Sequence, residues 1–265
     1  MRFITLLLGF VGAATLSACI NSTTLIKVKP DGRGTVEQTT LINTQAIKAM
    51  MPGMGQTGQS SNPVNDADLK RTAERMGPGV TVVSAEPVSA NGFEGVKAVF
   101  AFEDINQLQI SQDPDLGGGT RMAPDRKGND PVRFTLNHQG STSLLTITVQ
   151  DKPNATAKPT PDAGNMPDMT DPMMMGMIKS MFQGFKVNIG LEVIGTIVRT
   201  NAEYVNGPRL TLLEMDMGAL LEDEAKFKAL QGKLGPNASL SAVKPYLKDL
   251  KGIKIDGPVV TVEFR

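Results

Sequence analysis

The sequence predicts an α+β fold, with a mostly antiparallel sheet that is built from β-hairpins and covered by helices. Three observations favour this class. Segments of alternating apolar and polar residues occur in pairs around short glycine-containing turns, which is the pattern of β-hairpins. Segments with helical periodicity lie between these pairs. The two kinds of segment follow no regular βαβ order, which argues against a parallel sheet.

The first half of the chain contains two predicted hairpins. Residues 23–42 alternate apolar and polar side chains on either side of Pro30-Asp31-Gly32, which predicts a β-hairpin or one long strand interrupted by a turn. Residues 80–88 and 93–102 flank Asn91-Gly92. An Asn-Gly pair between two alternating segments is the strongest short signal for a hairpin.

Two helical segments lie between these hairpins. Residues 44–51 form a short helical patch, and residues 65–77 have the periodicity of a longer helix. We expect Asn65 or Asp66 to cap the start of the longer helix, because short polar side chains accept hydrogen bonds from the first free amides. Gly77 is expected to end it.

The second half of the chain repeats the hairpin pattern. Residues 132–149 are expected to turn near Gln139-Gly140, and residues 186–205 and 208–217 are expected to turn at Asn206-Gly207. Each pair of segments alternates apolar and polar side chains, so each predicts a strand with one buried face.

Three helices and one strand complete the expected elements. A helix is predicted over residues 171–185, with Asp171 as its N-cap and Pro172 at its first position. The remaining expected elements are helices at residues 219–235 and 239–252 and a closing strand at residues 254–265.

The domain organisation follows from these elements. Residues 25–265 are predicted to form a single α+β domain, because neither half of the chain alone offers many core-facing elements. Long polar stretches rich in Pro, Gly and Thr predict mobile loops near residues 52–64, 111–131 and 151–171. Such loops are either functional flaps or disordered insertions.

The N-terminus has the pattern of a signal peptide. Arg2 is followed by an apolar run over residues 3–16, which is too short to cross a bilayer as a helix. Cleavage after Ala18 would leave bulky Leu16 at position −3, where an ordinary secretory signal has a small residue. Leu16-Ser17-Ala18-Cys19 instead resembles the lipobox of bacterial lipoproteins.

This resemblance implies a cellular location and a lipid anchor. Residues 1–18 would be removed, Cys19 would carry a thioether lipid and an acyl chain such as palmitate, and residues 19–24 would form a lipidated tether. Two or more chains hold a protein stably in a membrane. Ile20 stands where an aspartate would signal retention in the inner membrane, so the resemblance implies the outer membrane, facing the periplasm.

Composition excludes several classes of function. Cys19 is the only cysteine, so the mature chain has no intramolecular disulfide, no thiolate nucleophile and no cysteine metal site after lipidation. The formal net charge is zero and tryptophan is absent. The chain therefore has no excess of basic charge and few aromatic residues for stacking, and no nucleic-acid partner is expected. No cofactor or metal is predicted.

Methionine is concentrated in residues 166–181, which we call the Met-rich segment and which include most of the expected 171–185 helix. On a helix, Met173, Met177 and Met181 share one face. The candidate ligand-binding residues are Met173, Met174, Met177, Ile178, Met181 and Phe182.

Three interpretations of this cluster remain open. Unbranched thioether side chains can fill irregular gaps in a buried helix. They also suit an adaptable surface for acyl chains or for an apolar segment of a partner. Clustered thioethers can bind Cu(I) as well, although no histidine or cysteine lies nearby in the sequence to complete such a site.

No catalytic residue is predicted. His138 is the only histidine, and a Ser-His-Asp arrangement would have to use it with Ser141 or Ser143. The chain has no G-x-S-x-G motif, and neighbouring residues of a hairpin point to alternate faces. We expect His138 to be an exposed turn residue and the protein not to be an enzyme.

The soluble part of the chain also resembles a known family. The opening strand KVKPDGRGTVE and the late hairpin GTIVRTNAEYVNGPRLTLLEMD, behind a lipidated cysteine, are similar to the LppM-type domain of bacterial lipoproteins. The resemblance covers residues 24–217 and departs from the family pattern at Leu212 and Leu213, where a tryptophan is expected. It implies an α+β domain of the cell envelope that is associated with lipid binding.

These observations lead to two functional hypotheses. The first is a membrane-anchored lipoprotein whose soluble domain binds an apolar ligand, such as a lipid or acyl chain, without catalysis. The alternative is a structural or assembly lipoprotein of the envelope that docks on a protein partner through its Met-rich helix. Both use Cys19 as the membrane anchor.

Overall fold

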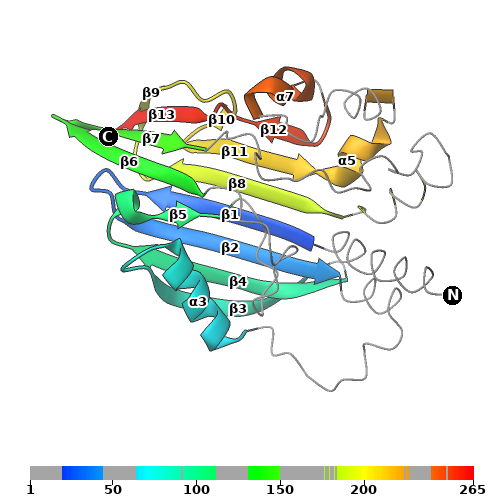
Figure 1. Cartoon of the computed structure of the whole chain (residues 1–265). Coiled ribbons are helices and arrows are strands. Elements are labelled where there is room, and N and C mark those ends of the chain that lie inside the picture. The colour runs from blue at the N-terminus through cyan, green and yellow to red at the C-terminus, as the bar shows by residue number, and fades with distance from the viewer. Residues whose placement is uncertain are drawn as a thin grey trace, which may run out of the picture.

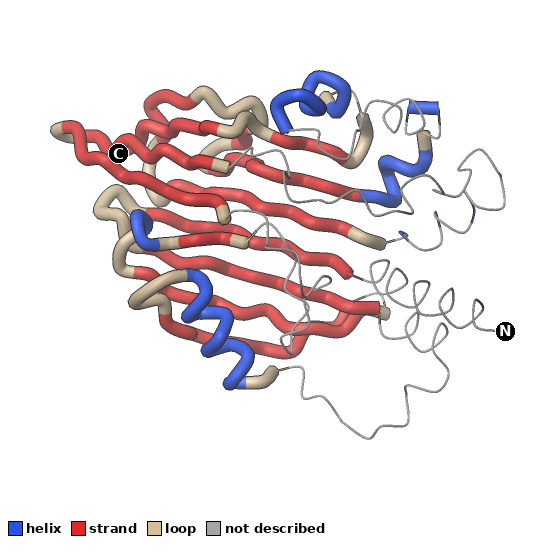
Figure 2. The backbone as a smooth tube through the Cα atoms, in the orientation of Figure 1, coloured by secondary structure: helices blue, strands red, loops and turns tan. Residues whose placement is uncertain are grey.

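The computed structural model describes residues 20–43, 64–90, 92–111, 131–149, 176, 179, 182, 184–223, 225–226, 240–248 and 250–265. These residues form two β-sheets that face each other across a shared core (Figure 1). Figure 2 shows that strands make up most of the fold and that the helices lie at its periphery.

Sheet A has eight strands. They are β1 Ile20–Val28, β2 Gly34–Asn43, β3 Thr81–Ala90, β4 Phe93–Phe102, β8 Lys186–Val193, β10 Val205–Asn206, β11 Arg209–Asp216 and β12 Ile253–Ile255. The order is β10-β11-β8-β1-β2-β4-β3, and β12 pairs with β11. All neighbours are antiparallel except β1 and β8, which run parallel from the pair Asn21 and Lys186 onward.

Sheet B has five strands, all antiparallel. They are β5 Gln109–Ile110, β6 Val132–Gln139, β7 Thr142–Thr148, β9 Ile197–Thr200 and β13 Val259–Phe264. The order is β5-β6-β7-β13-β9, which places the last strand of the chain between two others.

The main core lies between the sheets. Alternate residues of each strand point inward, as the two-residue period of a strand requires. Sheet A contributes Ile26, Val36 and Phe100, and sheet B contributes Leu145 and Phe264, all of which are fully buried. Because one cluster draws on both sheets, the sheets stabilise each other by removing this apolar surface from water.

The described helices are short and lie beside the sheets. They are α3 Asp66–Met76, the 3₁₀ helix η3 Ile105–Gln107, α5 Met217–Glu222 and α7 Leu240–Leu247. Helix α3 contacts β3 and β5 and turns Ala73 and Met76 into the main core. It begins where the sequence predicts, because the Asn65 side chain accepts a hydrogen bond of 3.0 Å from the Ala67 amide.

A second, smaller core lies where β11 and β12 meet the late helices. It contains Leu220, Leu247, Leu250 and Ile253, with Met217 packed against it. Figure 1 places α5 at the end of β11 and α7 beside β12. The late helices therefore have an apolar cluster of their own.

The predicted α+β class is wrong, because the described chain is mainly β. The three described α-helices have 11, 6 and 8 residues, and the layer that faces sheet A is a second sheet rather than a cover of helices. The alternating pattern identifies the buried face of each strand but not the sheet that the strand joins. The pattern therefore does not reveal that hairpin β6–β7 and strand β13 belong to a second sheet.

The predicted hairpins form, with two differences. The turns at Pro30-Asp31-Gly32, Gly92, Gly140 and Gly207 lie where the sequence places them. Residues 186–205 are not one strand, because the chain leaves sheet A after β8 and enters sheet B as β9. Residues 254–265 likewise divide into β12 and β13. The division lies at Asp256, whose carboxylate accepts hydrogen bonds from the Glu203 and Gly257 amides.

The predicted tether is also different in the structure. Residues 20–24 form the first half of β1, paired with β2 on one side and β8 on the other. The sheet therefore begins one residue after Cys19. The expected loops near residues 52–64, 111–131 and 151–171, and Cys19 itself, lie outside the described residues apart from positions 64, 111 and 131.

Candidate functional site

The parallel pairing of β1 with β8 brings two distant parts of the chain together. Asn21 pairs with Lys186, so the residues that precede each strand leave the sheet at the same end. In Figure 1, β1 and β8 both start at the right-hand side, where β2 and β11 end. We call this the β1-start end of sheet A. Both strands start at this end. In the sequence, Cys19 immediately precedes β1, and the Met-rich segment precedes β8.

Two phenylalanines lie at the β1-start end just before β8. The rings of Phe182 and Phe185 make an edge-to-face contact, with centroids 6.2 Å apart and planes at 88°. The Phe185 amide donates to the Phe182 carbonyl at 3.1 Å, and the Met217 amide donates to the Phe185 carbonyl at 3.1 Å. These backbone hydrogen bonds connect the residues that immediately precede β8 to the start of α5.

An ion pair between Lys186 and Asp216 also lies at the β1-start end. Lys186 Nζ lies 2.7 Å from Asp216, whose carboxylate also accepts a hydrogen bond of 3.1 Å from the Ala219 amide and so caps α5. Burial alone would raise the pKa of Asp216. The hydrogen bonds from Lys186 and from the Ala219 and Gly218 amides outweigh burial and hold this pKa below its ordinary value.

A third phenylalanine, Phe93, reaches this end from β4. It pairs with Asn43, the last residue of β2. Phe93, Phe182 and Phe185 are each partly exposed, and neither core cluster of the described residues contains them. The other described phenylalanines are buried between the sheets, namely Phe100, Phe102, Phe134 and Phe264.

The structure describes one of the predicted ligand-binding residues. Phe182 is helical, as are Gly176 and Lys179, and its side chain is partly buried. The predicted site residues outside the described part are Cys19, Met173, Met174, Met177, Ile178 and Met181. Phe93 was missed, because only the strand order β8-β1-β2-β4 brings it to this end. No pattern in the sequence around Phe93 indicates that it lies at the same end of the sheet as Phe182 and Phe185.

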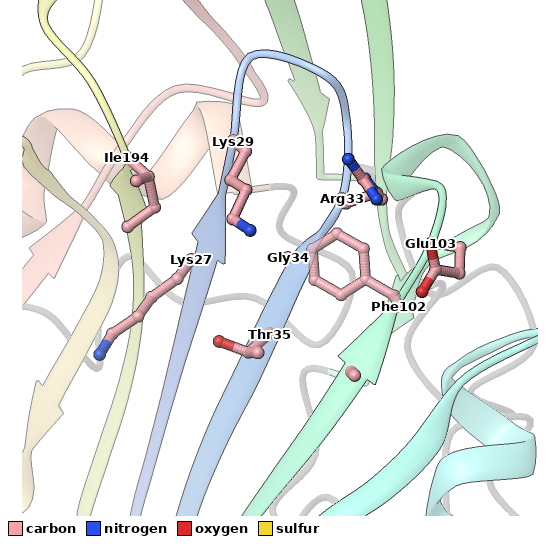
Figure 3. A pocket seen from close by; sticks show the side chains of 9 residues that line it. Lys27, Lys29, Arg33, Gly34, Thr35, Phe102, Glu103 and Ile194 are labelled. Carbon is pink, nitrogen blue, oxygen red and sulfur yellow. The ribbon is translucent and has the colours of Figure 1, made fainter.

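A shallow groove lies at the opposite end of sheet A, beside the β1–β2 turn (Figure 3). Its volume is about 390 Å³, and its lining residues are Lys27, Lys29, Arg33, Gly34, Thr35, Ala101, Phe102, Glu103 and Ile194. The groove therefore combines three cations with an apolar floor.

Two of these three cations are already paired. Lys27 lies 2.5 Å from Glu37, and Arg33 lies 2.7 Å from Asp31. The hydrogen bonds from Arg33 lower the pKa of Asp31. Among the described residues, no carboxylate lies within ion-pair distance of Lys29, which is exposed. One free surface cation in an open groove can attract an anion only weakly.

His138 lies next to Ser143, the serine with which it would have to form a catalytic pair. Its Nδ1 lies 3.1 Å from Ser143 Oγ, and the Ser143 hydroxyl donates to the Pro30 carbonyl at 2.8 Å. That serine is buried and links sheet B to the turn of the first hairpin. Its proton is therefore used in a structural hydrogen bond, and Nδ1 of His138 donates to the same oxygen.

Two further observations concern the described residues. Within them, no group of three or more His, Cys, Asp or Glu side chains is arranged to hold a metal ion. None of the helices in the described ranges is long and apolar enough to cross a membrane.

Comparison with known proteins gives a distant structural similarity. No protein-family model matches the chain, and no curated protein matches it. Among solved structures, the folded domain of the LppM protein of Mycobacterium tuberculosis, determined by NMR, is similar at 11% identity with a TM-score of 0.32. The similarity covers 93% of this chain and 90% of that one. At this TM-score the likeness is weak, and no function is transferred from it.

Proposed function

We propose that this chain is a membrane-anchored lipoprotein of the bacterial envelope, attached through Cys19, whose β-sandwich binds an apolar ligand without catalysing a reaction. The ligand class is a lipid or an acyl chain. The proposed location is the outer membrane, on its periplasmic face, as the lipobox and Ile20 imply.

The parallel pairing of β1 with β8 carries this proposal. It joins the residues after Cys19 to the residues after the Met-rich segment in one pair of adjacent strands. Neighbouring strands lie about 4.8 Å apart, so the strand starts that follow Cys19 and the Met-rich segment in the sequence lie side by side. A binding segment next to the anchor can exchange an acyl chain with the membrane over a short path.

The local chemistry supports an apolar ligand. Phe182 and Phe185 are large, partly exposed and held in a fixed mutual orientation by their edge-to-face contact. The segment before them is rich in methionine, whose flexible side chains adapt to ligands of varied shape. Aromatic and thioether groups with few charges between them are typical of a site that excludes water.

Native mass spectrometry of the purified full-length chain tests the binding proposal. After incubation with lipids extracted from the envelope, we expect a protein species with one added lipid mass. Phe182→Ser should weaken this species, because losing a buried aromatic contact of about 2 kcal/mol corresponds to roughly thirtyfold in affinity. Val198→Ser is the matched control, since Val198 is an exposed apolar residue of β9.

A second experiment, photo-crosslinking, separates this function from its alternative. A photo-crosslinking residue at Phe182 should give lipid adducts if the segment binds lipid, both in cells and in the purified chain that carries one added lipid mass. A single protein adduct without lipid would favour the structural or assembly role, in which the segment docks on an envelope partner. The binding proposal fails if the wild-type chain shows no lipid-bound species or if Phe182→Ser and Val198→Ser behave alike.

A further inference from the structure

The described phenylalanines divide into two groups by position. Phe100, Phe102, Phe134 and Phe264 are at most 3% exposed and fill the space between the sheets. Phe93, Phe182 and Phe185 are partly exposed and all lie at the β1-start end. Large aromatic side chains left partly in water at one end of a molecule indicate a contact with something apolar.

These three residues flank the start of β1 on both sides. Phe185 immediately precedes β8, the direct neighbour of β1. Phe93 starts β4, which is two strands away on the other side, across β2. At about 4.8 Å per strand, the backbones of both residues lie within roughly 10 Å of the β1 start.

The chain at the centre of this arrangement comes directly from the lipobox cysteine. Ile20 is the first residue of β1 and is buried, so no flexible linker separates Cys19 from the sheet. A lipid on Cys19 would therefore be attached one residue from the β1 start, which lies within roughly 10 Å of the Phe93 and Phe185 backbones. This short connection holds the β1-start end close to the bilayer.

We propose that the β1-start end of sheet A is a membrane-contacting surface, in which Phe93, Phe182 and Phe185 insert into the lipid interface around the anchor. The inference rests on the proposed lipidation of Cys19. Phenylalanine is favourable at this depth in a bilayer. Lys186 is half-exposed at the same end, but its charge is paired with Asp216, so the proposed contact rests on the phenylalanines and the anchor.

The opposite end of the sheet carries a mixed surface. Lys29, Asp31 and Arg33 are exposed there around the β1–β2 turn, and so are the apolar side chains of Val82, Val83 and Ile194. What distinguishes the β1-start end is therefore its position next to the lipobox cysteine together with its phenylalanines. The nine-residue β1 spans roughly 26 Å at about 3.3 Å per step. The sandwich therefore stands on the membrane with its strands directed away from it, and the groove of Figure 3 faces the aqueous compartment.

Depth-dependent fluorescence quenching tests this orientation. Cys19 is the only cysteine, and lipidation consumes its thiol, so an introduced cysteine can be labelled selectively. The full-length lipidated chain would be reconstituted into phosphatidylethanolamine and phosphatidylglycerol vesicles containing brominated lipid. One label would be placed at Ala90→Cys, exposed at the β1-start end, and the other at Gln139→Cys, the exposed last residue of β6 beside the β6–β7 turn.

We expect brominated lipid to quench the Ala90→Cys label several-fold more than the Gln139→Cys label. Phe93→Ser should reduce quenching at Ala90→Cys while the protein stays with the vesicles, because Cys19 still anchors it. Val198→Ser should leave the quenching unchanged. Circular dichroism would verify that each variant remains folded.

Two results would overturn the proposal. Equal quenching of the two labels would mean that the sandwich lies flat, and no quenching of either label on a membrane-bound chain would mean that it stands off the surface. Mass analysis of the N-terminal peptide reports lipidation separately. An unlipidated Cys19 refutes the anchor, whereas a lipidated chain that binds lipid but leaves Ala90→Cys unquenched refutes only the orientation.

Discussion

At the scale of single residues, the first hairpin depends on a position that has no room for a side chain. A Cβ on Gly34 would overlap the Lys27 carbonyl oxygen and lie 2.6 Å from Cζ of Phe102. The Phe102 ring lies against the Gly34 backbone (Figure 3). Gly34 therefore lets β1, β2 and the end of β4 approach closely beside the turn, and it also lines the groove.

Gly34→Ala should destabilise the fold. Forcing an extra methyl group into a packed site typically costs about 1–3 kcal/mol. Urea titration followed by circular dichroism measures the change. Gly176→Ala is the control, because Gly176 is helical with open space around it, and alanine there should be neutral or stabilising by about 0.5–1 kcal/mol. Equal stability of the two variants would contradict this account of Gly34.

At the scale of elements, the late helix α5 starts on a carboxylate with two roles. Asp216 caps the helix through the Ala219 amide and pairs with Lys186 of β8. Its own amide donates to the Gly252 carbonyl at 2.6 Å, next to β12. This residue thus connects β8, α5 and the chain before β12 at the β1-start end.

The lowered pKa of Asp216 predicts a pH dependence of stability. A carboxyl whose pKa is lower in the folded chain stabilises the fold above its ordinary pKa, near 4, and loses this effect as the pH falls through the folded value. The urea midpoint of Asp216→Asn should therefore lie below that of the wild type at pH 7 and converge with it below about pH 4. Asp216→Ala should cost about 1 kcal/mol more, because it also removes the cap. A difference that persists unchanged at low pH would exclude this role of the charge.

The elements also show what the sequence can and cannot predict. The turns at Gly92, Gly140 and Gly207 and the cap at Asn65 follow from local chemistry, and they were predicted correctly. The sheet that each strand joins depends on contacts between residues far apart in the chain. The parallel pairing of β1 with β8 has no local signal, so the neighbours Phe93 and Phe185 could not be placed together from the pattern alone.

At the scale of the whole molecule, the described chain has two apolar clusters of unequal size. The main core joins both sheets and α3, whereas the second core serves β12, α5 and α7. Residues in the smaller cluster have fewer buried neighbours. We therefore expect the late helices to open before the sandwich does.

Two leucine truncations test this hierarchy. Leu145→Ala, in the main core, should lower the free energy of unfolding by about 2–5 kcal/mol and reduce hydrogen-exchange protection in both sheets. Leu220→Ala, in the second core, should reduce protection mainly in α5, α7 and β12. Uniform loss of protection in Leu220→Ala would mean that the two clusters unfold as one unit.

The central position of β1 has a consequence for how the chain acquires its structure. One edge of β1 can pair with β2 as soon as the first hairpin exists, but its other partner lies about 165 residues later. Sheet B has a similar delay, because β13 at the far end of the sequence separates β7 from β9. Contacts between such distant segments form slowly and leave unpaired strand edges exposed in the meantime. The folding chain therefore passes through an aggregation-prone interval, in which a holding chaperone bound to the open edge of β1 would protect it.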